Sequence, residues 1–196
     1  TVVGIAFTAR FLNQASALVN VHRDGTVQVS TGATEMGQGV NTKIRSVVAS
    51  AFAIDPGMVS LMPTSTEKNH NTSPTAASSG SDLNGAAALA ACAEIKARLA
   101  IVSRDLPWRE LVQKAYLERV SLGALGFFRT EGLDFNETSR SGRAFNYFTQ
   151  GAAVSEVEID EYTGELKIRR VDLLMDLGRP LNPGIDRGQV IGAFIQ

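Results

Sequence analysis

The sequence has very few residues that bind metals or form cross-links. Its 196 residues include one cysteine, Cys92, and two histidines, His22 and His70. One cysteine cannot build a disulfide framework, and these three side chains cannot form a zinc site or hold an iron–sulfur cluster. No apolar run approaches the ~20 residues of a membrane-spanning helix, and a net charge of −1 without a basic stripe argues against nucleic-acid binding. We therefore expect a cytoplasmic protein that binds neither membranes nor nucleic acid.

Several familiar catalytic motifs are also missing. Thr42-Lys43 has neither the order nor the spacing of a P-loop, and Gly37-x-Gly39 lacks the third glycine of a dinucleotide fingerprint. No Gly-x-Ser-x-Gly elbow accompanies the serines. Glu35 is the only carboxylate inside a glycine-rich loop, and we expect it to accept a hydrogen bond at the start of the next helix rather than to act in acid–base catalysis.

The composition is that of an ordinary globular domain, with 44% hydrophobic and 20% charged residues. We expect residues 1–196 to form a single domain. The chain opens Thr-Val-Val-Gly, without an initiator methionine, and the helical pattern of Ile185 to Gln196 carries no stop signal. These features predict a fragment of a longer subunit.

Two β-hairpins stand out in the pattern of apolar residues. Ala17 to Thr31 alternates apolar and polar residues around Asp24-Gly25, and Ala153 to Met175 does so around Thr163-Gly164. Asp-Gly between two alternating runs is a strong hairpin signal because the turn positions favour positive φ. Two further strands are predicted at Gly4–Phe11 and Met58–Met62.

Helices are predicted between and after the hairpins. Apolar residues recur at helical spacing from Val40 to Phe52, from Leu83 to Leu99 with Ser81 as N-cap, and from about Pro107 to Ala115. Hairpins interspersed with helices, without regular βαβ alternation, predict an α+β fold in which helices pack on β-hairpins and a mixed sheet.

One glycine-rich loop, Thr31 to Lys43 (T-G-A-T-E-M-G-Q-G-V-N-T-K), leads from a strand into a helix. Gly37 and Gly39 free the backbone just before the helix, where unpaired amides and the helix dipole would suit an anion or a row of acceptors. The alternative is a plain glycine turn capped by Thr34 or Asn41. The pattern alone does not decide between these two interpretations.

A second loop, Asn69 to Ser81 (N-H-N-T-S-P-T-A-A-S-S-G-S), also leads into a helix. Its residues Thr75 to Ser78 are all small, which permits a ligand to approach the backbone closely. Gly188-Gln189, expected near the start of the last helix, forms a third candidate of this kind. Spacing does not show whether the three segments converge.

Four segments together carry a specific signature. They are G-I-A-F-T-A-R-F-L-N-Q-A-S-A-L-V (Gly4 to Val19), T-E-M-G-Q-G-V-N-T-K (Thr34 to Lys43), N-T-S-P-T-A-A-S (Asn71 to Ser78) and L-N-P-G-I-D-R-G-Q-V-I-G-A-F-I-Q (Leu181 to Gln196). In order and spacing the chain resembles the molybdenum-binding subunit of the xanthine dehydrogenase/aldehyde oxidase family of molybdenum hydroxylases. The resemblance covers essentially the whole chain.

This resemblance implies a molybdopterin–molybdenum cofactor bound between the loops, and it implies roles for individual residues. Those implied to contact the cofactor are Met36, Gln38, Ala76, Ala77, Ser78, Gly80 and Gln189. Those implied to contact the substrate are Phe7, packed edge-on against a heterocycle, Thr8, a hydrogen-bonding position, and Leu12, a wall of the substrate funnel. Loops Glu35–Gly39 and Thr75–Gly80 should then lie close together, because both would border one elongated cofactor.

The same resemblance implies what lies outside the chain. In the family the pterin holds the metal, so no direct metal ligand is expected here, and the catalytic glutamate belongs to a G-x-G-E segment that this sequence lacks. The implied partners are the remaining domains of the molybdenum subunit, the domains or subunit that carry iron–sulfur clusters and FAD, and a purine or related heterocyclic substrate. The fragment alone is expected to be inactive and to contain no molybdenum.

Three functions remain open at this stage. The first is a part of a hydroxylase that converts hypoxanthine and xanthine to urate. The second is a part of a related molybdenum hydroxylase for aldehydes or other N-heterocycles. The third is an isolated, non-catalytic α+β module.

Overall fold

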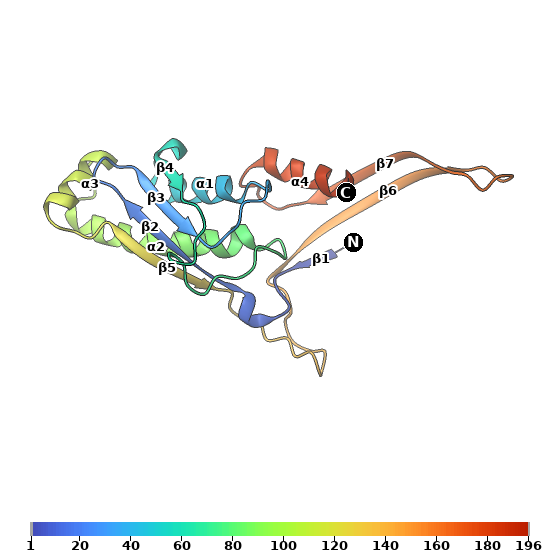
Figure 1. Ribbon diagram of the computed structural model, residues 1–196, viewed down its shortest axis with the longest axis horizontal. Helices are drawn as coiled ribbons and strands as arrows, with labels where there is room; N and C mark the ends of the chain where they lie inside the picture. Colours follow the sequence, from blue (N-terminus) through green and yellow to red (C-terminus); the bar gives the residue numbers. More distant parts are fainter. Residues whose placement is uncertain (1, 196) are drawn as a thin grey trace.

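The computed structural model describes residues 2–195, which form two β-sheets and four α-helices (Figure 1). The strands are β1 (Val2–Ile5), β2 (Gln14–Val21), β3 (Val27–Thr31), β4 (Val59–Leu61), β5 (Gly123–Arg129), β6 (Tyr147–Ile159) and β7 (Leu166–Asp176). The helices are α1 (Val40–Phe52), α2 (Gly80–Val102), α3 (Trp108–Leu117) and α4 (Pro183–Ile195), with short 3-10 turns at Arg10–Leu12 and Pro56–Met58.

The larger sheet has the strand order β4-β3-β2-β5, and the core of the molecule lies between this sheet and the helices α1, α2 and α3. Only its β3–β4 pair is parallel, so the sheet is mixed and the predicted α+β class is confirmed. The first predicted hairpin is also confirmed, because Val19 pairs with Val29 and Val21 with Val27. These side chains are buried on one face, as alternation requires.

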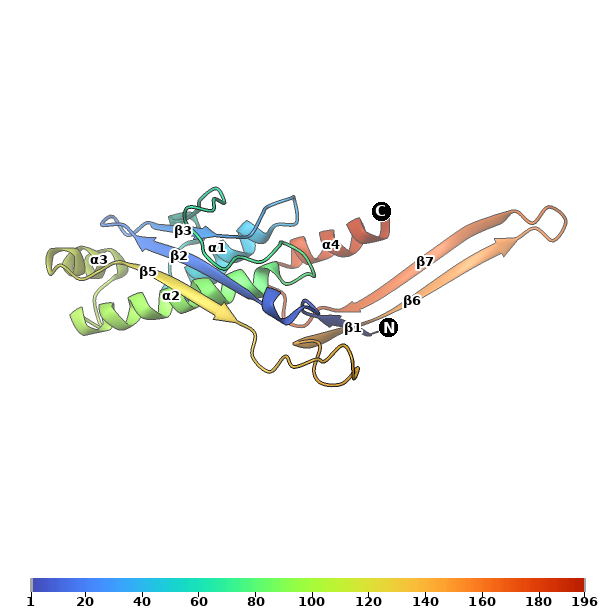
Figure 2. The same cartoon turned by 60° about the horizontal axis from the view of Figure 1, so that its bottom comes forward.

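Helices α1 and α2 pack side by side against this sheet (Figure 2). Helix α2 buries a strip of small residues that includes Ala87 and Ala91. Gly126 of β5 lies so close to this strip that a Cβ there would stand 2.1 Å from the Ala87 carbonyl oxygen. The small residues therefore let the helix backbone approach the strand.

This close approach predicts a large effect for a small substitution. Gly126→Ala should destabilise the fold by about 1–3 kcal/mol, because the new methyl group meets backbone atoms that cannot rotate away. Gly85→Ala in α2 is the matched control, since its Cβ would have its nearest neighbour at an ordinary 3.9 Å and alanine favours helices. Thermal unfolding measures both variants, and equal midpoints would contradict the packing.

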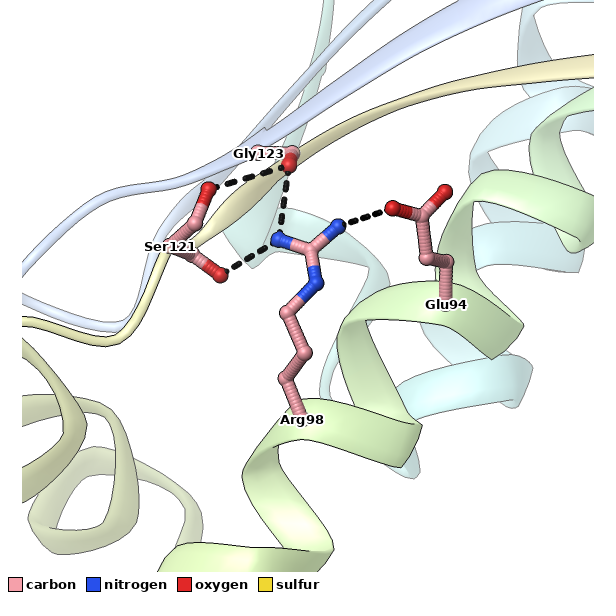
Figure 3. A network of polar contacts seen from close by, with 4 residues as sticks. All are labelled: Glu94, Arg98, Ser121 and Gly123. Carbon is pink, nitrogen blue, oxygen red and sulfur yellow. Dashed lines mark hydrogen bonds and ion pairs between the residues drawn. The ribbon is translucent and has the colours of Figure 1, made fainter.

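A polar network fixes the C-terminal half of α2 to the start of β5 (Figure 3). The Arg98 guanidinium donates to the carbonyl oxygens of Ser121 at 2.7 Å and Gly123 at 2.9 Å, and it also pairs with Glu94 one turn earlier in the helix. The network satisfies two carbonyl groups at a point where the chain enters the sheet.

The smaller sheet has the order β1-β6-β7 and consists mainly of the second predicted hairpin, which is confirmed. Val157 pairs with Ile168 and Ile159 with Leu166, around the turn that holds Gly164. In both views the hairpin projects far beyond the rest of the molecule (Figures 1 and 2).

None of the helices within residues 2–195 combines the length and the apolar composition that a bilayer-spanning helix needs.

Two local predictions were wrong. The strand expected at Gly4–Phe11 ends at Ile5, and Phe7 lies in a loop. The cause is buried Asn13, whose side chain accepts from the Phe7 amide at 2.9 Å and donates to the Phe7 carbonyl at 2.7 Å, in place of a neighbouring strand. Ser81 is not an N-cap, because α2 already begins at Gly80.

The last helix begins slightly earlier than predicted. Asn182 precedes it and accepts hydrogen bonds from the amides of Gly184 and Ile185, while Pro183 occupies the first helical position, where no amide is needed. Gln196, the predicted end of this helix, lies outside the described residues.

Candidate functional site

A cavity of about 1050 Å³ lies between the core and the base of the hairpin. Its walls come from the loop before α1, the loop before α2, the first turn of α2, the basal parts of β1, β6 and β7, and helix α4. These segments come from both ends and the middle of the sequence. A cavity of this size is large enough for a cofactor.

Six of the seven residues that the resemblance assigned to a cofactor line this one cavity: Met36, Gln38, Ala76, Ser78, Gly80 and Gln189. Ala77 is exposed and is not among the lining residues. The expected proximity of the two loops is confirmed, since the Thr34 amide donates to Thr75 Oγ1 at 2.9 Å and both loops border the cavity.

The Glu35 carboxylate organises the glycine-rich loop. One of its oxygens accepts from the amides of Gly37 and Gly39 at 2.9 Å, and the other accepts from the Asn41 amide at 3.0 Å. The predicted hydrogen bond of Glu35 at the helix start is therefore confirmed. Neither interpretation of this loop holds as stated, because the amides of Gly37 and Gly39 are paired with Glu35 and the N-cap residue is Gly39, with no side-chain cap from Thr34 or Asn41.

This arrangement makes the loop sensitive to acid. Partial burial raises the pKa of Glu35, but the hydrogen bonds from backbone amides lower it more, and the net pKa lies below the ordinary value of 4.5. Because the pKa is depressed in the folded state, the stabilisation is complete above the unfolded pKa and is lost as the pH falls through the folded one.

We therefore expect amide hydrogen exchange in residues 35–41 to accelerate in acid, after correction for intrinsic rates. Peptide-resolved exchange between about pH 3 and about pH 7 measures this effect. Glu35→Gln is the control, because it keeps the shape of the side chain but removes its titration. An equally steep pH dependence in the Gln variant would contradict the role of this carboxylate.

The side chain of Gln38 completes the loop. Its Nε2 donates to the Thr34 carbonyl at 2.8 Å, and its Oε1 accepts from the Met36 amide at 2.5 Å. Gln38 thus holds the loop closed across its own turn, while the Met36 side chain is 67% exposed where the loop borders the cavity.

Helix α4 closes another side of the cavity. Lys43 of α1 and Asp186 of α4 form an ion pair at 2.6 Å with side chains only 18% and 14% exposed, and Ile185 packs against Gly39. The helix starts at Pro183, so Gln189 lies well inside it. The prediction that Gln189 lies near the helix start was therefore wrong. Gln189 therefore contributes its side chain to the cavity, and its backbone lies within the helix.

A second polar contact joins the hairpin to the core across the cavity wall. The Tyr147 hydroxyl of β6 donates to Asp82 of α2 at 2.7 Å. Burial raises the pKa of Asp82, and the hydrogen bond from Tyr147 and the charge of Lys43 oppose that rise only in part. Burial and the neighbouring Asp82 likewise raise the pKa of Tyr147, so the hydroxyl stays a donor at neutral pH.

The residues assigned to a substrate lie elsewhere. Phe7 is partly buried against the main core, Thr8 is exposed and Leu12 is partly buried, and none of the three lines the cavity. The loop before α2 connects the two regions, because Ser73 donates a hydrogen bond to the Leu12 carbonyl.

Sequence reasoning missed the residues that hold the walls of the cavity together: Lys43, Asp82, Tyr147 and Asp186. Lys43 pairs with Asp186, 143 positions away in the chain, and Tyr147 pairs with Asp82, 65 positions away. No local pattern signals such pairs. Across residues 2–195 no group of three or more His, Cys, Asp or Glu side chains could hold a metal ion.

Comparison with known proteins supports the resemblance seen in the motifs. Residues 1–196 match the molybdopterin cofactor-binding domain family. Xanthine dehydrogenase of Oryza sativa subsp. japonica is 50% identical over 199 residues, which are 100% of this chain and 14% of that protein. Xanthine dehydrogenase/oxidase of Felis catus is 48% identical over 199 residues, 100% of this chain and 15% of its own length. The chain thus spans about one seventh of these curated relatives.

Solved structures show the same fold at lower identity. The aldehyde oxidoreductase from Desulfovibrio gigas superposes with a TM-score of 0.80 at 21% identity, covering 97% of this chain and 21% of that one. Quinoline 2-oxidoreductase from Pseudomonas putida 86 gives 0.75 at 21% identity, covering 91% and 25%. The match of the family model to every residue carries the assignment: this chain belongs to the molybdopterin cofactor-binding domain family.

Proposed function

We propose that the chain is one domain of a longer, cytoplasmic xanthine dehydrogenase-like hydroxylase and supplies one side of its molybdopterin site. The observation that carries this proposal is the single cavity that gathers Met36, Gln38, Ala76, Ser78, Gly80 and Gln189 from three distant segments. The proposed substrate is a purine, hypoxanthine or xanthine, or a related heterocycle. The other proposed partners are the remaining molybdenum domains and the domains or subunit that carry iron–sulfur clusters and FAD.

The residues around the cavity fit a flat, polar cofactor. Small residues such as Ala76 and Gly80 leave room beside the backbone, and the Gln189 side chain supplies both a donor and acceptors. The Glu35 carboxylate already accepts hydrogen bonds from the amides of Gly37, Gly39 and Asn41, so these three amides are not assigned to a ligand phosphate. When bound, molybdopterin supplies the redox chemistry of hydroxylation, and this chain positions it and excludes water.

Phe7, Thr8 and Leu12 are proposed as substrate contacts, and Ala77 as a cofactor contact. Phe7 offers an aromatic edge to a heterocycle, and the loop before α2 links it to the cavity region through the contact of Ser73 with Leu12. No residue of this chain is assigned as the catalytic base, and none is assigned as a direct metal ligand.

The test is to express the full-length polypeptide that contains this chain. We expect about one molybdenum per polypeptide by mass spectrometry and oxidation of xanthine to urate with a suitable electron acceptor. Aldehydes and other N-heterocycles serve as parallel substrates. Molybdenum with turnover of these compounds but not of purines would contradict the substrate proposal, and the absence of both molybdenum and turnover would contradict the proposed function.

A further inference from the structure

The hairpin formed by β6 and β7 has two chemically different faces. Cross-strand partners point to the same face of a two-stranded ribbon, so the pairing assigns each paired residue to a face. One face, which we call the apolar face, contains Val157, Ile159, Leu166, Ile168, Leu173 and Met175, and along it Ser155 opposite Val171 is the polar exception.

The opposite face is charged over its outer half. Glu158 pairs with Lys167 across the strands and also forms an ion pair with Arg169, while Arg170 pairs with Asp172. Nearer the base this face carries Val154 and Leu174. Charged pairs of this kind remain solvated, so we take the outer half of this face as the solvent-facing side.

A β-bulge keeps the two faces separate. The register shifts between Glu156 and Val157, so that Arg169 and Arg170 lie together opposite Glu156. Without the extra residue, alternation would turn every residue of β7 beyond this point to the other face. The bulge thus holds both arginines on the charged face and keeps Val171 and Leu173 in line with Ile168.

The basal part of the apolar face borders the cavity, with Leu173 44% and Met175 42% exposed, and its outer part lies away from the cavity. Leu173 and Met175 line the cavity together with Val190 and Phe194 of α4. Farther out, Leu166 is 56% and Ile168 66% exposed in this chain. A two-stranded ribbon is only marginally stable in water by itself, and an exposed apolar face of this kind, interrupted only at Ser155, marks an interaction surface.

We propose that the apolar face of this hairpin docks against another apolar segment of the same long polypeptide. The inference rests on the proposed function, in which the chain is one domain of a larger enzyme. The relatives support this occupant, since about six sevenths of their length lies outside the matched region.

The size of the face argues against a second copy as the occupant. A ribbon of two strands offers roughly 300–400 Å² on one face, judged from strand spacing and rise. A stable interface between separate molecules buries about 800 Å² on each partner. A segment tethered on the same polypeptide needs less area, because its effective concentration is in the millimolar range.

Single cysteines test the proposal in the full-length polypeptide. Ile168→Cys places a thiol on the apolar face, and Lys167→Cys places one on the adjacent position of the charged face. Burial raises the pKa of the native Cys92 thiol to about 12, so this residue should not compete for a maleimide reagent. We expect the Ile168→Cys peptide to react at least about tenfold more slowly than the Lys167→Cys peptide under native conditions, and at the same rate after denaturation.

Two outcomes would overturn the proposal. Equal native rates would show that the apolar face is uncovered, and protection lost on hundredfold dilution would identify a second copy as the occupant. Hydrogen exchange of the unsubstituted polypeptide gives an independent check, because the outer hairpin should be as protected as β2. Molybdenum content separates the two hypotheses: a loaded enzyme with equal rates refutes docking alone, and protection without molybdenum refutes the cofactor site alone.

Discussion

Ala76→Trp in the full-length polypeptide is expected to lower its molybdenum content at least about tenfold. Ala76 lines the cavity in the loop before α2, where only small residues stand between the backbone and the open space. An indole ring at this position would project into the volume assigned to the cofactor. Binding of a cofactor that fills its site closely cannot tolerate an added ring without displacement of the backbone.

A tryptophan on α2, away from the cavity, provides the control. Ala90 is exposed on α2 and does not line the cavity, so Ala90→Trp should leave the molybdenum content unchanged. Molybdenum is measured by mass spectrometry, and the midpoint of thermal unfolding shows that both variants fold. Full molybdenum content in a folded Ala76→Trp variant would contradict the placement of the cofactor.

Lys43→Met is expected to loosen α4 and to weaken retention of the cofactor. The substitution leaves Asp186 without its partner in a largely buried position. We expect a loss of about 2 kcal/mol in local stability, between the values typical of exposed pairs and of fully buried ones. Hydrogen exchange of residues 183–195 measures this loss directly, and α4 should exchange faster than α2 in the variant.

A double substitution distinguishes lost pairing from lost packing. Lys43→Met combined with Asp186→Leu removes both charges, so no buried charge remains unpaired, and most of the stability of α4 should return. Asp186→Leu alone completes the cycle: if the double variant loses the sum of the two single effects, the two residues do not interact and the ion pair does not hold the wall of the cavity.

The helices and hairpins of this chain could be predicted because their signals are local. Alternation around Asp24-Gly25 places Val19 opposite Val29, and helical spacing from Val40 to Phe52 defines α1. Each pattern reports one buried face, and burial of that face dominates the local energetics. The strand predicted at Gly4–Phe11 was wrong because one buried amide side chain, that of Asn13, satisfies the backbone of Phe7 and ends the strand early.

The motifs predicted residues of which six line one cavity, while the contacts that build the walls of that cavity were not predicted. The sequence pattern correctly indicated that Glu35 accepts a hydrogen bond at the start of the helix. It did not show that this carboxylate also accepts the hydrogen bonds of the Gly37 and Gly39 amides. The contacts that close the cavity, such as that of Lys43 with Asp186, join residues far apart in the chain. Such pairs depend on how the elements are arranged in space, and no periodicity encodes them.

The most direct test of the account is a crystal structure of the full-length, cofactor-loaded polypeptide. We expect the pterin in the cavity between residues 34–39 and 75–80, with the side chain of Gln189 within hydrogen-bonding distance of the cofactor, and anomalous scattering at the molybdenum edge would locate the metal. A cofactor bound elsewhere, with protein side chains filling this cavity, would contradict the account.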